Sequence, residues 1–274
     1  DGVVFRLAED RLWYVHADRD VFTWLQALKP GYNVYIRNPG AWAIQIQGPT
    51  SLEILDACVD GGAPEGFKYY YSRQVTMGGQ PVLISRTGWT AELGFEVYNM
   101  DPNVDGMALW SHLMVAGKPH GMEILSTYAM NPRRIEAGIM NYGTDMGWDT
   151  TPFDLGLGEF VDFDHEFLGR DALQSAERKQ RFTGFRTEAR DIKWGSPVFA
   201  NSKAVGSVKA FEHSPTLGTG IGYVLFDTHD TMAISGFCIK DRAGKEYPID
   251  LHTLPFFDPE KRIPRGLEAM VFTG

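Results

Sequence analysis

The sequence predicts an α+β protein whose C-terminal part is built from β-structure alone. Up to about residue 180, short apolar segments typical of strands alternate with segments of helical periodicity. From about Arg181 the helical periodicity stops, and short strand-like segments separated by Gly and Pro take over. No apolar run approaches the roughly 18–20 residues that a membrane-spanning helix needs.

The composition is that of an ordinary globular protein, with 43% hydrophobic and 22% charged residues, which excludes wholesale disorder. The formal net charge of −9 argues against a nucleic-acid partner, because attraction to phosphates needs clustered Lys and Arg. The 2 cysteines are too few for a disulfide scaffold and fit a reducing, cytoplasmic setting. We therefore expect neither a nucleic acid nor a membrane as a partner.

Strands in the first part are predicted from apolar alternation or from short apolar runs. They are expected at residues 3–7, 12–15, 42–46, 68–75, 81–85 and 95–98. The first two form a hairpin around Glu9-Asp10, and Gly78-Gly79 supplies the turn between the strands at 68–75 and 81–85. Tight turns of this kind favour antiparallel sheets.

Helices are predicted from amphipathic periodicity and from capping residues. They are expected at residues 18–28, from Thr50 onward, at residues 105–116, from Asn131 onward and at residues 170–179. Asn131 is expected to cap its helix, because Pro132 then occupies the first helical position.

The C-terminal strands are expected at residues 207–211, 220–226 and 232–239. We expect an α+β core at residues 1–180 and a β-domain at residues 181–274. The chain opens at Asp1 without Met and runs directly into a strand, so we also expect further sequence upstream.

The most unusual segment lies at residues 85–98, where Gly88 and Gly94 frame a loop that holds Trp89. Glu96 sits in the apolar strand that follows, and a carboxylate there needs a partner or a ligand. It could hold a flat heterocycle through two parallel hydrogen bonds, with an aromatic ring stacked on its face. Spacing alone favours the alternative, an exposed side chain on the polar side of an edge strand.

No metal site is expected. His16, Asp18 and Asp20 match no ligand pattern, and they suit a strand end followed by an Asp-capped helix. The sequence also lacks the common phosphate-loop, dinucleotide-binding, nucleophile-elbow and zinc-protease motifs.

Three stretches together resemble the aminomethyltransferase family, which comprises the T-protein of glycine cleavage and its relatives. They lie at residues 85–96, 134–146 and 151–173, with shorter matches in the same order at 46–49, 69–72 and 214–218. The resemblance implies a three-lobed, cloverleaf-like α+β fold of antiparallel sheets with helices, and a barrel-like C-terminal lobe. It implies tetrahydrofolate as the cofactor, two interwoven lobes within residues 1–180, and an N-terminal part of the fold that is missing from the sequence.

The resemblance also implies roles for individual residues. Glu96 would hold the pterin ring, and Trp89 occupies the position of a folate-contacting Tyr. Asp1 matches a catalytic acid near the reactive folate nitrogens. Other cofactor-binding positions would be those of His16, Tyr71, Arg134 and Ser214.

Three departures from the T-protein pattern bear on the substrate. Met130 stands in place of an Arg, Glu159 in place of a Trp, and His16 in place of an Asn. These three departures are compatible with pterin binding, but they argue against an aminomethyl-lipoyl substrate. Residues 12–21 and Trp89 look closer to the family's folate-dependent demethylases. The iron–sulfur maintenance branch is disfavoured, because residues 166–171 lack its Cys.

We therefore predict a tetrahydrofolate-dependent one-carbon transferase. The leading interpretation is a demethylase that moves a methyl group from a small N-, O- or S-methyl compound to tetrahydrofolate. Two alternatives stay open: an aminomethyltransferase of glycine cleavage, with a lipoyl carrier protein as partner, and a non-catalytic folate-binding protein or fragment. The absence of a Cys or Ser nucleophile motif agrees with direct transfer to the folate nitrogen.

Overall fold

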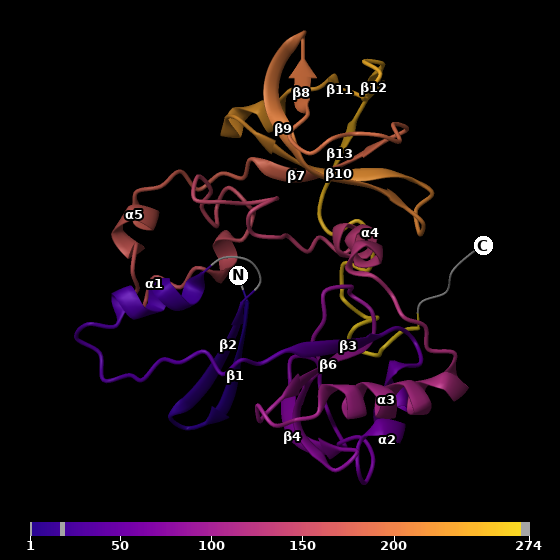
Figure 1. Cartoon of the computed structure of the whole chain (residues 1–274). Coiled ribbons are helices and arrows are strands. Elements are labelled where there is room, and N and C mark those ends of the chain that lie inside the picture. The colour runs from indigo at the N-terminus through magenta and orange to yellow at the C-terminus, as the bar shows by residue number, and fades with distance from the viewer. Residues whose placement is uncertain (1, 17–19, 270–274) are drawn as a thin grey trace. The chain divides into compact units, whose positions relative to one another are not determined.

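The computed structural model describes residues 2–16 and 20–269 (Figure 1). The chain forms two compact units. Unit 1 comprises Asp1–Tyr128 and Glu260–Gly274, and unit 2 comprises Ala129–Pro259. These two units are defined by the compactness of the chain. They do not test the division into domains at residues 1–180 and 181–274, which stays a prediction. No helix among the described residues is long and apolar enough to cross a membrane.

Unit 1 opens with the predicted hairpin, formed by β1 (Gly2–Ala8) and β2 (Arg11–His16). The strands pair antiparallel, with Phe5 opposite Trp13. Alternation puts one set of side chains on each face of the hairpin. Apolar residues of one face pack around buried Phe5 and against Leu83 and Tyr98.

The main sheet of unit 1 has four antiparallel strands in the order β3-β6-β5-β4. These strands are β3 (Ala43–Gln47), β4 (Ser72–Met77), β5 (Gln80–Ser85) and β6 (Gly94–Asn99). The Gly78-Gly79 turn between β4 and β5 is confirmed, and both glycines have positive φ (54° and 77°). Asp60 accepts hydrogen bonds from both of their N–H groups.

Two helices, α2 (Ser51–Cys58) and α3 (Gly106–Gly117), pack on one face of this sheet (Figure 1). The core between them consists mainly of Ile46, Leu55, Val82, Ile84, Phe95, Val97, Leu109 and Leu113. Because strand side chains alternate between faces, Leu83 and Tyr98 point to the opposite face, where they meet the hairpin. Glu96 shares that face, since it lies between Phe95 and Val97.

Capping side chains explain where the helices α1 and α3 begin. The Asp20 carboxylate accepts from the N–H of Thr23 at 2.9 Å and begins α1 (Val21–Leu28). Asp105 accepts from the N–H groups of Met107 and Ala108 in the same way and begins α3. The helix expected at 18–28 therefore begins after Asp20, and residues 17–19 lie outside the described residues. The strand expected at 68–75 begins only at Ser72, because the chain turns at Tyr70, whose φ is 66°.

The β-structure expected after Arg181 is confirmed in unit 2, where seven antiparallel strands form a near-closed barrel in the order β12-β11-β8-β9-β10-β7-β13. They are β7 (Phe182–Thr187), β8 (Pro197–Ala200), β9 (Lys203–Ser214), β10 (Thr219–Phe226), β11 (Phe237–Lys240), β12 (Glu246–Pro248) and β13 (Asp250–His252). The strand expected at 232–239 starts only at Phe237, because a 3-10 turn, η4 (His229–Ala233), precedes it. The other 3-10 turns are η1 (Lys118–His120), η2 (Thr127–Ala129) and η3 (Gly158–Phe160).

The capping role expected for Asn131 is wrong. Helix α4 (Met130–Glu136) begins two residues earlier than predicted, with Ala129 in the cap position. The Asn131 amide donates to Glu212 at 2.8 Å, and its carbonyl oxygen accepts from Arg134 at 2.8 Å. These tertiary partners take the side chain away from the helix N-terminus.

The helix expected at 170–179 is shorter than predicted. Helix α5 (Arg170–Gln174) has its cap position at Ser175. Farther along, Glu177 and Lys179 form ion pairs with His229 and Asp230 of η4. The chain after Ser175 is therefore held by charge pairs instead of helical hydrogen bonds.

Candidate functional site

Glu96 lies at the centre of the sheet face that carries no helix. On β6 it pairs with Gln45 of β3 on one side and with Ser85 of β5 on the other. Its side chain is half-buried, so it combines partial desolvation with access to solvent. A half-buried carboxylate in the middle of a sheet needs hydrogen-bond donors.

Protein donors meet that need. Glu96 Oε2 accepts from the Thr87 hydroxyl and from the Tyr98 hydroxyl, the latter at 2.9 Å. Oε1 accepts from the Gln45 amide at 3.1 Å. The Ser85 and Thr87 hydroxyl oxygens lie 2.5 Å apart, so Ser85 extends the network. Burial raises the pKa of the Tyr98 hydroxyl, and the Glu96 charge raises it further, so this phenol remains a donor.

Trp89 lies half-buried in the loop between β5 and β6, and this loop is organised around Gln47. The Gln47 side chain accepts from Thr90 at 2.7 Å and donates to the backbone carbonyls of Thr87 and Phe95. A Cβ at Gly88 or Gly94 would clash with the Gln47 amide. The two glycines that frame the loop are thus required by a close approach to one side chain.

Tyr71 comes directly before β4, and its side chain is 48% exposed. Its backbone carbonyl accepts from the Arg86 N–H at 2.9 Å, so Tyr71 flanks the start of the loop that carries Trp89. His16 ends β2 opposite Gly2. Its Nδ1 is buried and has no hydrogen-bond partner within residues 2–16 and 20–269. Asp1, the predicted catalytic residue, lies outside the described residues.

Arg134 and Ser214 belong to unit 2, and both are buried among its polar groups. Arg134 forms an ion pair with Asp145, and its Nε donates to Asn131. The Ser214 hydroxyl donates to Glu136 and accepts from the Leu217 N–H at 2.9 Å. Both side chains thus have partners within the protein, and their cofactor-binding roles stay predictions.

Glu136 is a buried group that is not among the predicted site residues. It accepts from Ser214 and from both the hydroxyl and the N–H of Thr216, and it forms an ion pair with Arg133. These bonds join α4 to the turn between β9 and β10. The available signal was that Arg134 and Glu136 do not share a helix face, so each side chain needs a partner elsewhere.

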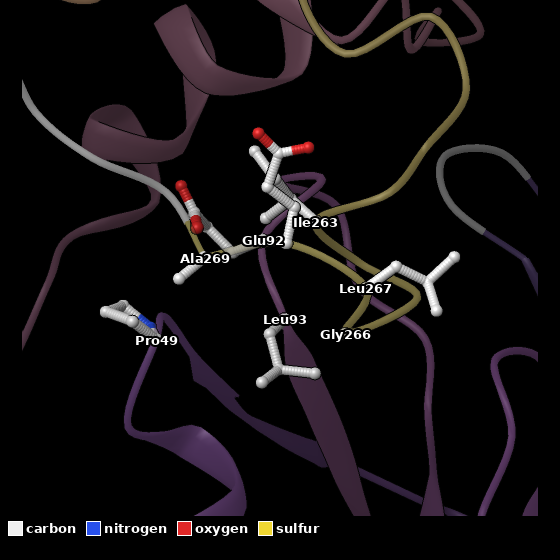
Figure 2. Close-up of a pocket in the computed structure, with 8 residues that line it drawn as sticks. Pro49, Glu92, Leu93, Ile263, Gly266, Leu267 and Ala269 are labelled. Carbon is white, nitrogen blue, oxygen red and sulfur yellow. The ribbon is translucent and has the colours of Figure 1, made fainter.

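A hollow of about 220 Å³ lies beside the loop that carries Trp89 (Figure 2). Its walls come from the turn before α2, the end of the loop and the segment after Glu260, namely Pro49, Glu92, Leu93, Ile263, Gly266, Leu267, Glu268 and Ala269. Arg86 donates to the Pro264 carbonyl at 3.3 Å and so ties that segment to the loop. None of the predicted site residues that the structure describes lines this hollow.

In the described part of the chain, no group of three or more His, Cys, Asp or Glu side chains is placed to hold a metal ion. The described site of unit 1 is instead a hydrogen-bonded carboxylate on the sheet face that carries no helix, next to a loop that contains an aromatic ring. This arrangement can accept N–H donors from a flat ligand.

The fold is that of the T-protein class of aminomethyltransferases. A crystal structure of the glycine cleavage system aminomethyltransferase T from Bartonella henselae matches with a TM-score of 0.74 and 24% identity. The match covers 87% of this chain and 65% of that one.

The chain belongs to the glycine cleavage T-protein family. Residues 1–165 match the GCVT N-terminal domain, and residues 180–258 match the glycine cleavage T-protein C-terminal barrel domain. The family predicted from the sequence is therefore confirmed.

Three relatives illustrate the similarity. The aminomethyltransferase of Streptomyces avermitilis is 34% identical over 95% of this chain and 73% of its own length. That of Caldanaerobacter subterraneus subsp. tengcongensis is 37% identical over 68% of this chain and 50% of its own length. That of Alkaliphilus oremlandii is 35% identical over 83% of this chain and 64% of its own length. The chain thus spans from half to about three-quarters of these relatives. All three are named aminomethyltransferases, which favours that alternative over the demethylase.

Proposed function

We propose that this protein is a tetrahydrofolate-dependent aminomethyltransferase of the glycine-cleavage type. The proposal is supported by family membership and by relatives of that name at 34% to 37% identity. The observation that carries it is the half-buried carboxylate of Glu96, held by hydroxyl donors on the sheet face that carries no helix. The proposal includes the cytoplasmic setting expected from the sequence. The free thiols of Cys58 and Cys238 agree with a reducing compartment.

The surroundings of Glu96 fit a pterin ring. A pterin presents adjacent N–H groups, and a carboxylate can accept two of these in parallel. Two hydroxyls donate to Oε2, whereas within residues 2–16 and 20–269 Oε1 has one donor, the amide of exposed Gln45. A carboxylate has about four lone-pair sites, so acceptor capacity is left at Oε1.

The residues of this chain would bind and orient the cofactor. Glu96 would accept its N–H groups, Trp89 and Tyr71 would offer aromatic faces, and His16 would line the pocket from the end of β2. Asp1 would stabilise positive charge that develops near the reactive nitrogens. Tetrahydrofolate, when bound, supplies the nucleophilic nitrogen that accepts the one-carbon unit.

The aminomethyl donor in this proposal is a lipoyl carrier protein. The second candidate function is the demethylase, with a small methyl compound as donor. Three residues favour it, because His16, Met130 and Glu159 depart from the T-protein pattern. The two candidates share the Glu96 site and differ in the donor.

Calorimetric titration of the chain with tetrahydrofolate tests the shared site. Micromolar affinity is expected, and Glu96→Gln should weaken it, because an acceptor is replaced by a donor that opposes the pterin N–H groups. Glu65→Gln is the matched control, since Glu65 is exposed in a loop of unit 1. Equal affinity in all three proteins would refute the assignment of Glu96.

Product analysis then separates the candidates. Methylene-tetrahydrofolate formed from an aminomethylated lipoyl protein supports the aminomethyltransferase. Methyl-tetrahydrofolate formed from N-, O- or S-methyl compounds supports the demethylase. Binding without either product would favour the third alternative, a folate-binding protein without catalytic activity.

A further inference from the structure

The two oxygens of the Glu96 carboxylate have different surroundings. Oε2 accepts two hydroxyl donors that approach from different elements: Thr87 from the loop after β5, and Tyr98 from β6 itself. Thr87 is 5% exposed and Tyr98 is 3% exposed, so solvent competes little for either hydroxyl. Oε1 faces the exposed Gln45 amide at 3.1 Å.

The direction of the hydroxyl chain follows from its geometry. An ionised carboxylate only accepts hydrogen bonds, so the Thr87 hydroxyl must donate its proton to Glu96. Thr87 therefore accepts from Ser85, whose oxygen lies 2.5 Å away and whose side chain is 0% exposed. Ser85 in turn fixes the rotamer in which Thr87 points at Glu96.

Tyr98 is fixed from a different direction. Its ring makes an edge contact with the buried ring of Phe5, with centroids 5.5 Å apart and planes at 65°. Phe5 lies on the hairpin, and the hairpin also carries His16. Tyr98 thus connects the Glu96 carboxylate to the packing between hairpin and sheet.

These contacts limit rotation of the carboxylate, because turning it would break two hydrogen bonds at Oε2 at once. We propose that Thr87 and Tyr98 are positioning residues that hold Oε2 and so present Oε1 to the N–H donors of the ligand. The inference rests on the proposed function, since it assumes that Glu96 receives a pterin. It adds two residues that act through Glu96 without touching the ligand.

Three variants and a double-mutant cycle test the proposal, with tetrahydrofolate affinity measured by calorimetry. Thr87→Val keeps the shape and removes the hydroxyl, and Tyr98→Phe does the same for the phenol. Each should weaken binding about three- to tenfold, the effect of one lost hydrogen bond. Thr87→Ser restores a hydroxyl and should bind like the wild type.

The cycle separates positioning from a general structural effect. In the Glu96→Gln background, Tyr98→Phe should cause no further loss, because the group through which it acts is gone. Thr183→Val is the matched control. Thr183 is a buried threonine of unit 2 that donates to the His252 carbonyl, and its loss should leave affinity unchanged.

Several results would overturn the inference. Additive losses in the double variant would show that Tyr98 acts independently of Glu96. Wild-type affinity in both Thr87→Val and Tyr98→Phe, with Glu96→Gln still impaired, would refute the positioning role and leave the proposed function standing. A wild-type chain that binds no tetrahydrofolate would refute the proposed function, and the inference with it. Failure of Thr87→Ser to restore binding would assign the Thr87 effect to packing.

Discussion

Arg134 and Asp145 form an ion pair in the interior of unit 2, with 4% and 0% of their side chains exposed. The guanidinium also donates to Asn131 and to the Ile139 carbonyl. The carboxylate also accepts from the Asn141 N–H at 2.7 Å. Burial raises the pKa of Asp145, and the adjacent guanidinium acts against this rise. The pair fastens the end of α4 to the loop that follows it.

Removing one member of this pair should be costly. Arg134→Met leaves the Asp145 carboxylate buried without its counter-charge, and we expect a loss of about 3–5 kcal/mol in the free energy of unfolding. The double variant Arg134→Met with Asp145→Asn should recover part of it, because no uncompensated charge remains. Urea denaturation measures both. An unfolding free energy unchanged in Arg134→Met, together with lost folate affinity, would show that Arg134 serves the ligand instead of the fold.

We expect Asp154 to make the stability of unit 2 dependent on pH. Burial raises the pKa of its carboxyl, but hydrogen bonds from the Thr151 N–H and from Arg181 outweigh burial, so the pKa lies below its ordinary value. The unfolded chain then binds a proton more readily than the folded one. The stabilisation is therefore complete above about pH 4, near the unfolded pKa, and is lost as the pH falls through the folded value.

Hydrogen exchange of the β10 amides at pH 7 and at acid pH checks this expectation within unit 2. Asp154→Asn should reduce protection at pH 7, and the difference from the wild type should shrink as the medium becomes acid. The expected loss at pH 7 is about 1.5–3 kcal/mol, the range for hydrogen bonds to a charged group. A difference that stays constant with pH would contradict the assigned ionisation.

The Gln47 contact predicts a sensitivity at Gly94. In Gly94→Ala the new Cβ would displace the Gln47 amide, which is anchored by Thr90 and two backbone carbonyls. We expect a loss of about 1–3 kcal/mol in unfolding free energy, as for other overpacked sites. Gln47→Ala combined with Gly94→Ala should cost less than the sum of the two single changes, because the clash is gone. Additive costs would show that Gln47 is not the obstacle.

Cys58 should react slowly with alkylating reagents. It is 1% exposed, and burial raises the pKa of its thiol to about 11. Because the thiolate is the reactive form, iodoacetamide at pH 8 should label Cys58 far more slowly than a free thiol. Mass spectrometry of labelled peptides measures the rate, and unfolding in urea should abolish the difference. Rapid labelling of the folded chain would contradict the burial of Cys58.

Local patterns predicted the elements that local interactions determine. The hairpin strands, the Gly78-Gly79 turn and the helix capped by Asp105 are present, because alternation, turn residues and caps act over a few positions. Asn131 was assigned as a cap on the same kind of signal, and that assignment is wrong. Its amide meets Glu212, a partner 81 residues away, and that contact cannot be read from neighbouring positions.

The candidate site shows the same limit. Glu96 stood out because a charge interrupted an apolar strand, and strand alternation could have added Tyr98, two residues farther on the same face. Thr87 and Gln45 could not be found in this way, since they reach Glu96 from other elements. The Gln47 amide leaves no room for a Cβ at Gly88 or Gly94, and this contact can be seen only in the folded loop.

The Arg86 contact with Pro264 joins residues 178 positions apart, across the whole of unit 2 in the sequence. A ribosome makes Arg86 long before Pro264. Unit 2 is synthesised as one uninterrupted stretch of the chain. In unit 1, the loop that carries Trp89 can form its Arg86 contact only after residues 260–269 have been synthesised. The unit whose synthesis starts first is thus the last to be completed, and unit 2 can fold while unit 1 is still unfinished.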